Sequence, residues 1–389
     1  MSWPIVVVTG ANGGVGYSIC QRLIFQLSDM DQAFASPSSS REGDLFPYPC
    51  EGLTLIMACR SFHRADTARR ELYTSLDSHM AKKNTGYGGH AKRFRENLKI
   101  EIHTVDLAEI SSIFAFADEV SKTYPYISHF IFNAGVASYD HINFRKVVQQ
   151  FVVDPMGMMT TPKYNVHFVG ESTKDGLGLI WQSNLFGHYV LFRALHHLLS
   201  APAYKWDTRV IWMSSIEASP DLYASDDWQL IKHTISYNAV KYQIDILGTQ
   251  LDRIALETPD SEKRIRHIVV HPGIASTSFS NKLVNFWTNA LKVVLMYIAR
   301  WCGSRNHVID PFKAAISAVY ICLVPLSILS SSQVYKKGVY QPVRFAAETD
   351  RLGRAEVGVH TVKWWPEHQQ EAELLVDRCN NLYEEFKGR

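Results

Sequence analysis

The sequence lacks the features that mark several large classes of protein. Its six cysteines are scattered without a Cys-x-x-Cys pair. The sequence therefore indicates no zinc or other metal site and no disulfide framework, and we expect a reducing environment. The net charge of the 389-residue chain is only +2 at pH 7, too mild a surplus to indicate nucleic-acid binding. The first residues lack the basic region of a signal peptide, and we expect none. The cysteines are Cys20, Cys50, Cys59, Cys302, Cys322 and Cys379.

Uninterrupted apolar runs of the ~20 residues that a membrane-spanning helix needs are also missing. The apolar stretch 286–301 contains Lys292 and Arg300. We expect it to form an interfacial helix with aromatic and basic edges, with a helix packed on the sheet as the alternative. The shorter apolar stretch 314–329 contains Pro325 and is expected to belong to the core.

What the sequence does contain is a globular composition, 46% apolar and 20% charged, and a regular alternation of short apolar runs with helical patterns. Such an alternation predicts an α/β fold with a doubly wound parallel sheet, because parallel strands need helical crossovers. Predicted strands lie at 5–8, 53–58, up to about 105, 129–132, 210–213 and 265–270, and predicted helices at 15–27, 62–80, 178–200 and 236–256.

We expect a single domain over residues 1–345. Glycine-, serine- and charge-rich stretches predict surface insertions at about 28–50, 81–97 and 136–175, and a substrate or membrane segment at about 273–309. Residues 346–389 form a C-terminal extension. From Pro366 onward its apolar residues recur at helical spacing, which predicts an amphipathic helix packed on the body.

A glycine-rich turn, Thr9-Gly10-Ala11-Asn12-Gly13-Gly14-Val15-Gly16, joins the first predicted strand to the first helix. Phosphate oxygens bind at main-chain N–H groups of a helix N-terminus, and a Cβ would block their approach. A glycine turn in this place of a βαβ unit therefore predicts a dinucleotide site. We expect Gly10, Asn12, Gly14, Val15 and Gly16 to line it.

The ends of the next strands indicate which dinucleotide binds. The second predicted strand is followed by Arg60, where an acidic residue would accept from the ribose 2′-hydroxyl of NAD. An arginine there can pair with a 2′-phosphate, which favours NADPH; a solvated Arg60 and NAD are the alternative. Asp106 follows the third strand and either accepts from the adenine amino group or caps a helix. Asn133 ends the fourth strand, beside the expected cofactor.

A candidate catalytic pair opens the helix predicted at 236–256. Tyr237 and Lys241 are four residues apart and share a helix face. A phenol has a pKa near ~10, and a neighbouring ammonium would favour the phenolate and lower that pKa. We therefore expect Tyr237 to donate a proton to a carbonyl oxygen as hydride reaches the carbon.

Other polar residues are predicted at the same edge of the sheet. Ser215 follows the fifth strand and can hydrogen-bond a developing alkoxide; we choose it over Ser214, which is nearer the strand interior. Asn184 lies in the preceding helix and either holds a water that relays protons to Lys241 or simply bends the helix. A turn after the sixth strand places Pro272, Gly273 and Thr277 beside the nicotinamide.

These motifs, in this order, resemble the short-chain dehydrogenase/reductase family over roughly residues 3–345. The resemblance implies a seven-stranded Rossmann sheet and a catalytic tetrad of Asn184, Ser215, Tyr237 and Lys241, the last of which would also bind the nicotinamide ribose. It also implies pyrophosphate binding by Gly10, Gly14 and Gly16, and adenosine contacts by Asp106 and Asn133. One departure is Phe132, where the family usually has a second asparagine.

A narrower resemblance is to the fungal 3-keto-steroid reductases of ergosterol biosynthesis, a 3β-hydroxysteroid 3-dehydrogenase type of enzyme. It rests on the stretches 174–189, 212–216, 271–274 and 297–300, and on the insertion at 136–175. The resemblance implies NADPH-dependent reduction of the 3-keto group of sterol C-4 demethylation intermediates to the 3β-alcohol. It further implies that the protein is located at the endoplasmic reticulum membrane and lipid droplets.

The same resemblance implies protein partners. These are the sterol C-4 demethylation enzymes (the methyl oxidase, the decarboxylating C-3 dehydrogenase and their scaffold protein) and, in yeasts, the oxidosqualene cyclase. Two other functions stay open. One is the reduction of another lipid carbonyl, such as retinal or a fatty acyl ketone. The other is a non-catalytic NADP-binding scaffold, which usually lacks the tyrosine or the lysine; both are present here, as Tyr237 and Lys241.

Overall fold

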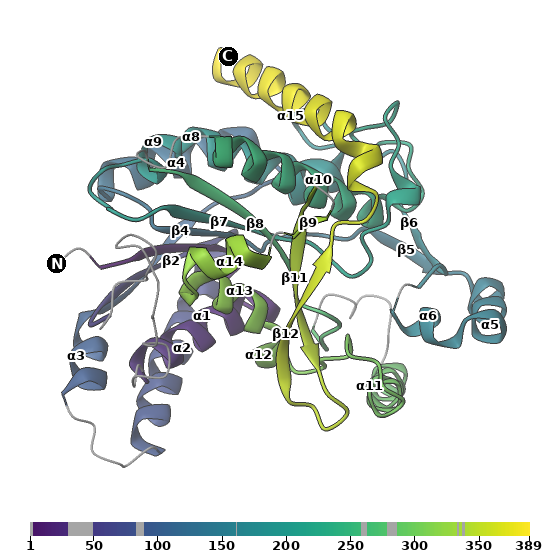
Figure 1. The fold of residues 1–389 in the computed structure, drawn as a ribbon, viewed down its shortest axis with the longest axis horizontal. Helices are drawn as coiled ribbons and strands as arrows, with labels where there is room; N and C mark the ends of the chain where they lie inside the picture. The colour runs from purple at the N-terminus through teal and green to yellow at the C-terminus, as the bar shows by residue number, and fades with distance from the viewer. Residues whose placement is uncertain are drawn as a thin grey trace.

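The centre of the protein is an eight-stranded sheet, seen in a computed structural model (Figure 1). Its order is β12-β11-β8-β7-β4-β1-β2-β3, and every neighbouring pair is parallel except β11 and β12. The strands are β1 (Ile5–Thr9), β2 (Leu53–Cys59), β3 (Leu98–Thr104), β4 (His129–Phe132), β7 (Thr208–Met213), β8 (Ile265–His271), β11 (Val343–Thr349) and β12 (Ala355–Thr361). The structure describes residues 3–29, 50–82, 89–160, 162–257, 263–277, 286–332, 334–336 and 339–389.

Helices cover both faces of this sheet (Figure 1). One layer contains α4 (Ile110–Thr123), α7 (Leu179–Trp181), α8 (Gly187–Ala194), α9 (His196–Leu199), α10 (Ser236–Glu257) and α15 (Trp365–Lys387). The other contains α1 (Gly14–Ser28), α2 (Phe62–Lys82), α3 (His90–Asn97), α12 (Pro311–Ala314), α13 (Ile316–Leu323) and α14 (Leu326–Ser332). The doubly wound α/β fold predicted from the sequence is confirmed.

The strand sequences explain why both faces are covered. All five residues of β1 are buried, and Val7 packs into the core on one face while Val6 and Val8 pack into the core on the other. Side chains alternate between the faces of a strand, so a continuous β-branched run such as this one needs a helix layer on each side. Most buried residues of the stretch 314–329 pack into the same core as Val6 and Val8, so the stretch belongs to the core, as expected.

The prediction of a surface loop at 81–97 is wrong in part. Helix α2 continues to Lys82, and a further helix, α3, covers His90–Asn97. Ala91 and Phe94 are three residues apart and buried, while the charged residues between and after them face solvent. One face of this short helix therefore packs on the core. Most of the insertion at 28–50 lies outside the described residues.

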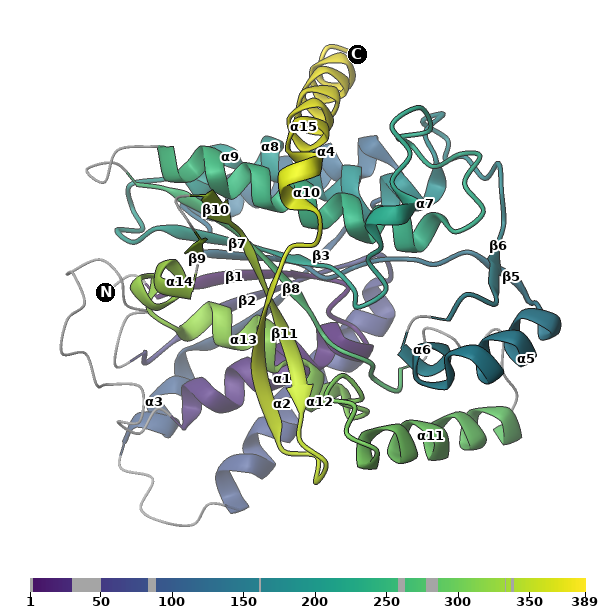
Figure 2. The same ribbon diagram turned by 45° about the vertical axis from the view of Figure 1, so that its right-hand side comes forward.

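The insertion at 136–175 has secondary structure of its own, beyond one end of the sheet (Figure 2). An antiparallel pair, β5 (Tyr139–Ile142) and β6 (Asn165–His167), carries two helices, α5 (Phe144–Val153) and α6 (Pro155–Thr160). Helix α11 (Phe286–Trp301) runs beside α6. None of the helices in the described ranges combines the length and the apolar character that crossing a membrane requires.

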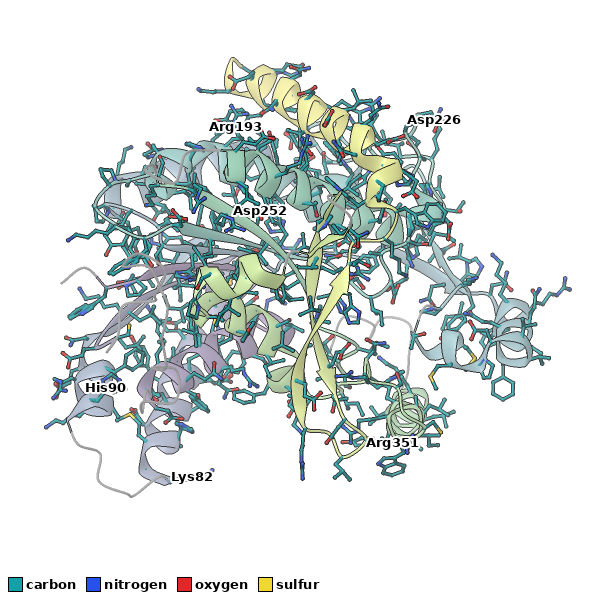
Figure 3. All side chains as sticks on the ribbon, viewed as in Figure 1. Lys82, His90, Arg193, Asp226, Asp252 and Arg351 are labelled. Atoms are coloured by element: carbon teal, nitrogen blue, oxygen red, sulfur yellow. The ribbon has the colours of Figure 1, made fainter. Side chains whose placement is uncertain are left out.

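The C-terminal extension adds to the sheet and to one helix layer. The resemblance implied seven strands, and the structure has these seven in parallel plus an antiparallel eighth, β12, which pairs along β11. Helix α15 packs along α10. Its Glu384 forms an ion pair at 3.0 Å with Arg193 of α8, a residue that Figure 3 labels. The amphipathic helix expected from Pro366 therefore exists. The domain boundary at residue 345 stays a prediction.

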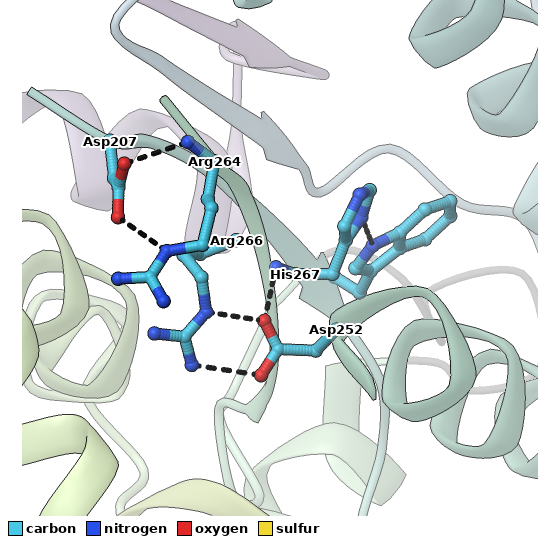
Figure 4. Close-up of polar contacts among 6 residues, drawn as sticks. Asp207, Asp252, Arg264, Arg266 and His267 are labelled. Carbon is cyan, nitrogen blue, oxygen red and sulfur yellow. Dashed lines mark hydrogen bonds and ion pairs between the residues drawn. The ribbon is translucent and has the colours of Figure 1, made fainter. Parts of the chain in front are cut away.

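A buried ion pair ties α10 to β8 (Figure 4). The guanidinium of Arg266 donates to both carboxylate oxygens of Asp252, at 2.7 and 2.9 Å, and Asp252 also accepts from the main-chain N–H of His267. The charge of Arg266, followed by these hydrogen bonds, keeps the pKa of Asp252 below its usual range despite burial. The helix that carries Tyr237 is thereby held against the sheet. A second small hairpin, β9 (Val334–Lys336) and β10 (Val339–Gln341), precedes β11.

Candidate active site

The glycine turn between β1 and α1 has the shape that a phosphate cradle requires. Gly10 and Gly14 have φ angles of +67° and +54°, a conformation that other residues rarely adopt. A Cβ on Gly16 would collide with the main-chain oxygen of Gly10 and the side chain of Asn133, so the helix can approach the strand only with glycine there. Space beside Gly13 is open. The turn fits a dinucleotide pyrophosphate at the N-terminus of α1.

The hydroxyl of Thr9 organises the chain beside this turn. Its oxygen accepts from the main-chain N–H groups of Asn133 and Ala134, both at 2.9 Å, and the Asn133 amide donates to the Thr9 main-chain oxygen at 3.0 Å. The ring of His188 lies 2.9 Å from the same hydroxyl. Burial lowers the pKa of His188 to about 3, so the ring is neutral at pH 7. Asn133 is thus fixed at the expected cofactor wall.

Two predicted adenosine contacts lie at the ends of β2 and β3. Arg60 is exposed directly after β2, with Arg64 also exposed one helical turn farther on, and neither has an ion pair among the described residues. Sequence reasoning missed Arg64. The carboxylate of Asp106 accepts from the main-chain N–H of Ala108 at 3.0 Å in the turn before α4 (Ile110–Thr123). The N-cap of that helix is Glu109, so the helix cap expected of Asp106 as an alternative is not formed. The adenine contact stays a prediction.

The turn after β8 returns the chain to the glycine turn. Gly273 has a φ of +65°, and a Cβ there would press on main-chain oxygens of Asn306 and Ala347. The methyl group of Thr277 lies 3.6 Å from the place of a Cβ on Gly14. Thr277 therefore lies beside the cradle, whereas the predicted contacts of Pro272, Gly273 and Thr277 with the cofactor stay a prediction. Residues 278–285 of this segment lie outside the described residues.

Tyr237 and Lys241 stand on the first turns of α10, and the ammonium of Lys241 lies 5.5 Å from the centroid of the Tyr237 ring. The ammonium donates to the main-chain oxygen of Met213 at 2.8 Å and is close to Gly135. Burial lowers the pKa of Lys241 to about 8. The structure therefore brings the predicted pair together at the ends of β4 and β7.

The expectation that Lys241 lowers the pKa of Tyr237 is wrong for this state of the protein. The pKa of Tyr237 is raised, first by burial and then by the carboxylate of Glu217, while a hydrogen bond from Ser215 opposes the rise. The ammonium of Lys241 donates to the main-chain oxygen of Met213 and lies over the phenol ring. Tyr237 therefore retains its proton at neutral pH.

The choice between two serines has a geometric basis. Ser215 hydrogen-bonds the phenol of Tyr237 and also accepts from the main-chain N–H of Glu217 at 3.1 Å. The hydroxyl of Ser214 is buried and donates to the main-chain oxygen of Lys241 at 3.1 Å. Only Ser215 can therefore face a substrate oxygen held by Tyr237, which supports its predicted role.

Asn184 lies in a π-helical turn, Gln182–Phe186, between α7 and α8. Its amide donates to the main-chain oxygens of Val136 and Ile180, both at 2.8 Å, and its carbonyl accepts from the Val136 N–H at 3.2 Å. The side chain is therefore bound between the helix and the chain that follows β4. Its closeness to Gly135, which also lies near Lys241, agrees with the expected relay. The water itself stays a prediction.

Three polar residues of the site were missed from the sequence. Glu217 lies beside Tyr237, with a carboxyl pKa raised to about 7 by burial. His167, from β6, accepts from the main-chain N–H of Tyr237 at 3.3 Å and so caps the catalytic helix. Arg344, from β11, donates to the main-chain oxygen of Ser215 at 3.2 Å and to Asp245 at 2.8 Å. No spacing in the sequence links them to the serine and tyrosine.

The comparisons with known proteins agree with this geometry. The 3-keto-steroid reductase of Candida glabrata is 29% identical over 317 residues, which cover 82% of this chain and 79% of that protein. The chain is an oxidoreductase similar to fungal 3-keto-steroid reductases. The 3-keto-steroid reductase ERG27 of Saccharomyces cerevisiae is 28% identical, over 82% of this chain and 81% of that protein. The resemblance expected from the sequence is thereby confirmed.

Two further comparisons bear on the family and the fold. No family model matches the chain. The solved structure of an uncharacterized protein from Mycobacterium Paratuberculosis aligns with a TM-score of 0.53 at 17% identity, over 98% of this chain and 93% of that one. At this identity the match shows the fold alone, and it agrees with the parallel sheet described above.

Proposed function

We propose that the protein uses NADPH to reduce the 3-keto group of sterol intermediates to the 3β-hydroxyl. The observation that carries the proposal is the grouping of Ser215, Tyr237 and Lys241 beside the glycine turn. The 3-keto-steroid reductases that match this chain over most of its length supply the substrate class.

Each side chain has a separate part in this reaction. The bound dinucleotide supplies the hydride. Tyr237, which holds its proton, donates it to the carbonyl oxygen, and Ser215 donates a hydrogen bond to the same oxygen as negative charge develops there. Lys241 holds the nicotinamide ribose and, when charged, favours the phenolate that remains. Asn184 is placed to hold a water that returns a proton toward Lys241.

The preference for NADPH over NADH is part of the proposal. Two exposed arginines, Arg60 and Arg64, follow β2, and neither is paired within the described part of the chain. A guanidinium can bind a 2′-phosphate through charge-assisted hydrogen bonds, and NADH has no such group. Titration of the protein with each cofactor, followed by fluorescence of the reduced nicotinamide, is expected to show tighter binding of NADPH.

Steady-state rates with NADPH and a panel of ketones test the substrate. We expect turnover of 4-methyl and 4-demethyl 3-keto sterols and little or none of retinal or fatty acyl ketones. Turnover of retinal or an acyl ketone alone would support the reduction of another lipid carbonyl. Binding of NADPH without turnover of any carbonyl would support a non-catalytic role.

The reaction has a place in C-4 demethylation on chemical grounds. A carboxyl group at C-4 is lost readily only when C-3 is a ketone, so decarboxylation leaves a 3-ketone that must be reduced. We propose that the protein consumes this product alongside the C-4 demethylation enzymes and the oxidosqualene cyclase, at the endoplasmic reticulum membrane or lipid droplets. Co-purification of the full chain with these enzymes, with the Tyr237→Phe variant in parallel, tests the association independently of turnover.

The membrane part of the proposal rests on two exposed helices, α5 and α11, which flank α6 (Figure 2). Their exposed apolar side chains are Phe144, Val148, Phe151, Val152, Val153, Leu291, Val294, Tyr297, Ile298 and Trp301. Exposed basic residues accompany them on α5, Arg145 and Lys146, and Lys292 on α11 is partly exposed, whereas Arg300 of α11 is buried. An apolar face with basic edges suits a surface of anionic lipid.

Flotation with liposomes tests this attachment. The full chain is expected to float with vesicles that contain anionic lipid, and a variant with Leu291, Val294 and Ile298 changed to serine is expected to float less. A matched variant with three serines on the exposed face of α2 should float as the wild type does. Equal flotation of all three proteins would count against the proposed surface.

A further inference from the structure

A buried histidine, His188 of α8, lies between the glycine turn and the candidate catalytic asparagine. Its ring is 1% exposed and stacks on Phe132 at the end of β4, with 4.8 Å between the ring centroids. Its Nε2 lies 2.9 Å from the hydroxyl oxygen of Thr9, and its Nδ1 lies 3.0 Å from the main-chain oxygen of Asn184. One ring therefore reaches both the strand that leads into the glycine turn and the helix that carries Asn184.

The partner at one end determines which ring nitrogen carries the hydrogen. A carbonyl oxygen only accepts, so Nδ1 of His188 must carry the hydrogen that bonds the main-chain oxygen of Asn184. Burial lowers the pKa of His188 to about 3, so the ring is neutral at pH 7 and its Nε2 has no hydrogen. Nε2 therefore accepts from the hydroxyl of Thr9.

The hydroxyl of Thr9 is fully used in this arrangement. It accepts from the main-chain N–H groups of Asn133 and Ala134, which form the expected cofactor wall, both at 2.9 Å. Its single hydrogen goes to His188 at 2.9 Å, because the main-chain oxygen of Ile131 is a more distant acceptor, at 3.4 Å. A hydroxyl group has one hydrogen and two lone pairs, so the direction of every hydrogen bond between the wall and His188 is determined.

At its other side His188 bonds a helix that changes its winding. Gln182–Phe186 is a π-helical turn, which is wider than an α-helix. In a regular α-helix, the main-chain oxygens of Ile180 and Asn184 would accept from N–H groups four residues farther on. Here the side chains of those farther residues, Asn184 and His188, donate to them, at 2.8 and 3.0 Å. The bond from His188 therefore holds the main chain of the turn that carries Asn184.

We propose that His188 is a positioning residue: with its hydrogen on Nδ1, the ring joins the cofactor wall to the π-helical turn and keeps Asn184 in register with the bound nucleotide. A shift at either end would move the Asn184 amide along the chain that follows β4, where it bonds the main chain of Val136. The inference rests on the proposed function in taking Asn184 as part of the catalytic group and the glycine turn as the nucleotide site.

Three replacements of His188 separate its two hydrogen bonds from its packing. In His188→Gln the amide oxygen lies near the place of Nε2 and can still accept from Thr9. In His188→Asn the amide nitrogen lies near the place of Nδ1 and can still donate to the main-chain oxygen of Asn184. His188→Phe retains a ring that stacks on Phe132 and loses both hydrogen bonds.

We expect the first two variants to affect different constants. His188→Gln should lower kcat for 3-keto sterols about fivefold, the equivalent of one hydrogen bond, with a smaller effect on the Kd for NADPH. His188→Asn should raise that Kd about fivefold, with a smaller effect on kcat. His188→Phe should show both losses, and His196→Gln, a matched change at an exposed histidine of α9, neither. If the glutamine and asparagine variants behave alike and His188→Phe is nearest the wild type, the ring only fills space and the inference is overturned.

The state of the ring can be observed without any substrate. The full chain is labelled with ¹⁵N-histidine, saturated with NADP⁺ and studied by NMR, and the His188 signals are assigned by their absence in the three variants. We expect the hydrogen on Nδ1 and no titration between about pH 5 and 8, the range in which an ordinary histidine titrates. A hydrogen on Nε2, or a ring that titrates in this range, would contradict the inference.

A second NMR readout separates the inference from the proposed function. In uniformly ¹⁵N-labelled protein, the side-chain amide signal of Asn184, assigned by its loss in Asn184→Asp, should move more in His188→Gln than in His188→Asn. If it does so while no 3-keto sterol is reduced, the substrate assignment fails and this inference stands. If sterols are reduced but the two variants move the signal equally, this inference fails alone.

Discussion

The ammonium of Lys241 donates to the main-chain oxygen of Met213 at 2.8 Å, which joins the catalytic helix to the end of β7. The side chain is 4% exposed, and burial lowers its pKa to about 8. Its hydrogen-bond acceptor is a neutral carbonyl and the charge of Asp245 offsets only part of the desolvation, so burying this cation costs stability. The position of Lys241 is therefore better explained by what it does in the reaction than by what it adds to folding.

Lys241→Met should make the cofactor-free protein more stable at pH 7 while abolishing turnover. An unfolded lysine has a pKa of about 10.4, so between about pH 8 and 10 the unfolded chain holds a proton that the folded chain has lost. The free energy of unfolding of the wild type accordingly rises with pH across this range. Below this range the buried charge of Lys241 lowers the free energy of unfolding. We expect the free energy of unfolding to increase by about 1–3 kcal/mol at pH 7.

Urea denaturation at pH 7 and at pH 9.5 measures this effect. The difference between the variant and the wild type should shrink at the higher pH. A Lys241→Met protein that is less stable than the wild type at both pH values would show that the bond to Met213 outweighs the buried charge.

Tyr237→Phe should lower kcat by at least ~10²–10⁴-fold, because the proton donor is lost while the ring is retained. The affinity for NADPH, measured by fluorescence titration, should remain within about twofold, since the pyrophosphate cradle is built by the glycine turn. Tyr320→Phe is the matched control, since that ring packs against Phe345 and is not part of the proposed catalytic group. Activity that survives in Tyr237→Phe would refute the proton-transfer role.

Arg60→Ala should raise the KM for NADPH by roughly 10- to 100-fold, the equivalent of one or two charge-assisted hydrogen bonds. The KM for NADH should change little, because NADH lacks the 2′-phosphate. Arg70→Ala on α2 removes an equally exposed guanidinium that pairs with Asp66, and it should affect neither cofactor. Equal changes for NADPH and NADH in Arg60→Ala would contradict the assigned contact.

Arg344→Met should cost about 3–5 kcal/mol in the free energy of unfolding, because it leaves the buried carboxylate of Asp245 without its partner. The change also frees the main-chain oxygen of Ser215, so kcat should fall in the protein that remains folded. Replacing both residues, with Asp245→Leu added, should restore most of the stability but not kcat. Arg389→Met, which removes an exposed ion pair with Glu385, should cost no more than about 1 kcal/mol.

The parallel strands and the glycine turn could be predicted from the sequence because each depends on neighbouring residues. A buried β-branched run such as 5–8 needs cover on both faces, and Gly10 and Gly14 need left-handed backbone. The same holds for Tyr237 and Lys241, which one helical turn brings together. Periodicity and spacing capture such local requirements.

The remainder of the site depends on contacts between distant parts of the chain. Arg344 reaches the main chain of Ser215 across 129 residues, and His167 caps Tyr237 across 70. Neither pairing leaves a trace in the spacing of residue types. The direction of the Tyr237 pKa was predicted wrongly for a similar reason, since burial and Glu217 act on the phenol and neither is visible from the Tyr-x-x-x-Lys spacing.

The hydrogen bonds of Arg344 have a consequence for how the protein is made. The strand that carries this arginine is among the last elements of the chain, and it completes the support of a serine that was synthesised well over a hundred residues earlier. A nascent chain that has exposed the glycine turn, Ser215 and α10 but not β11 should bind nucleotide before it can turn over ketone. Activity would then begin only after the ribosome has released the C-terminal strands.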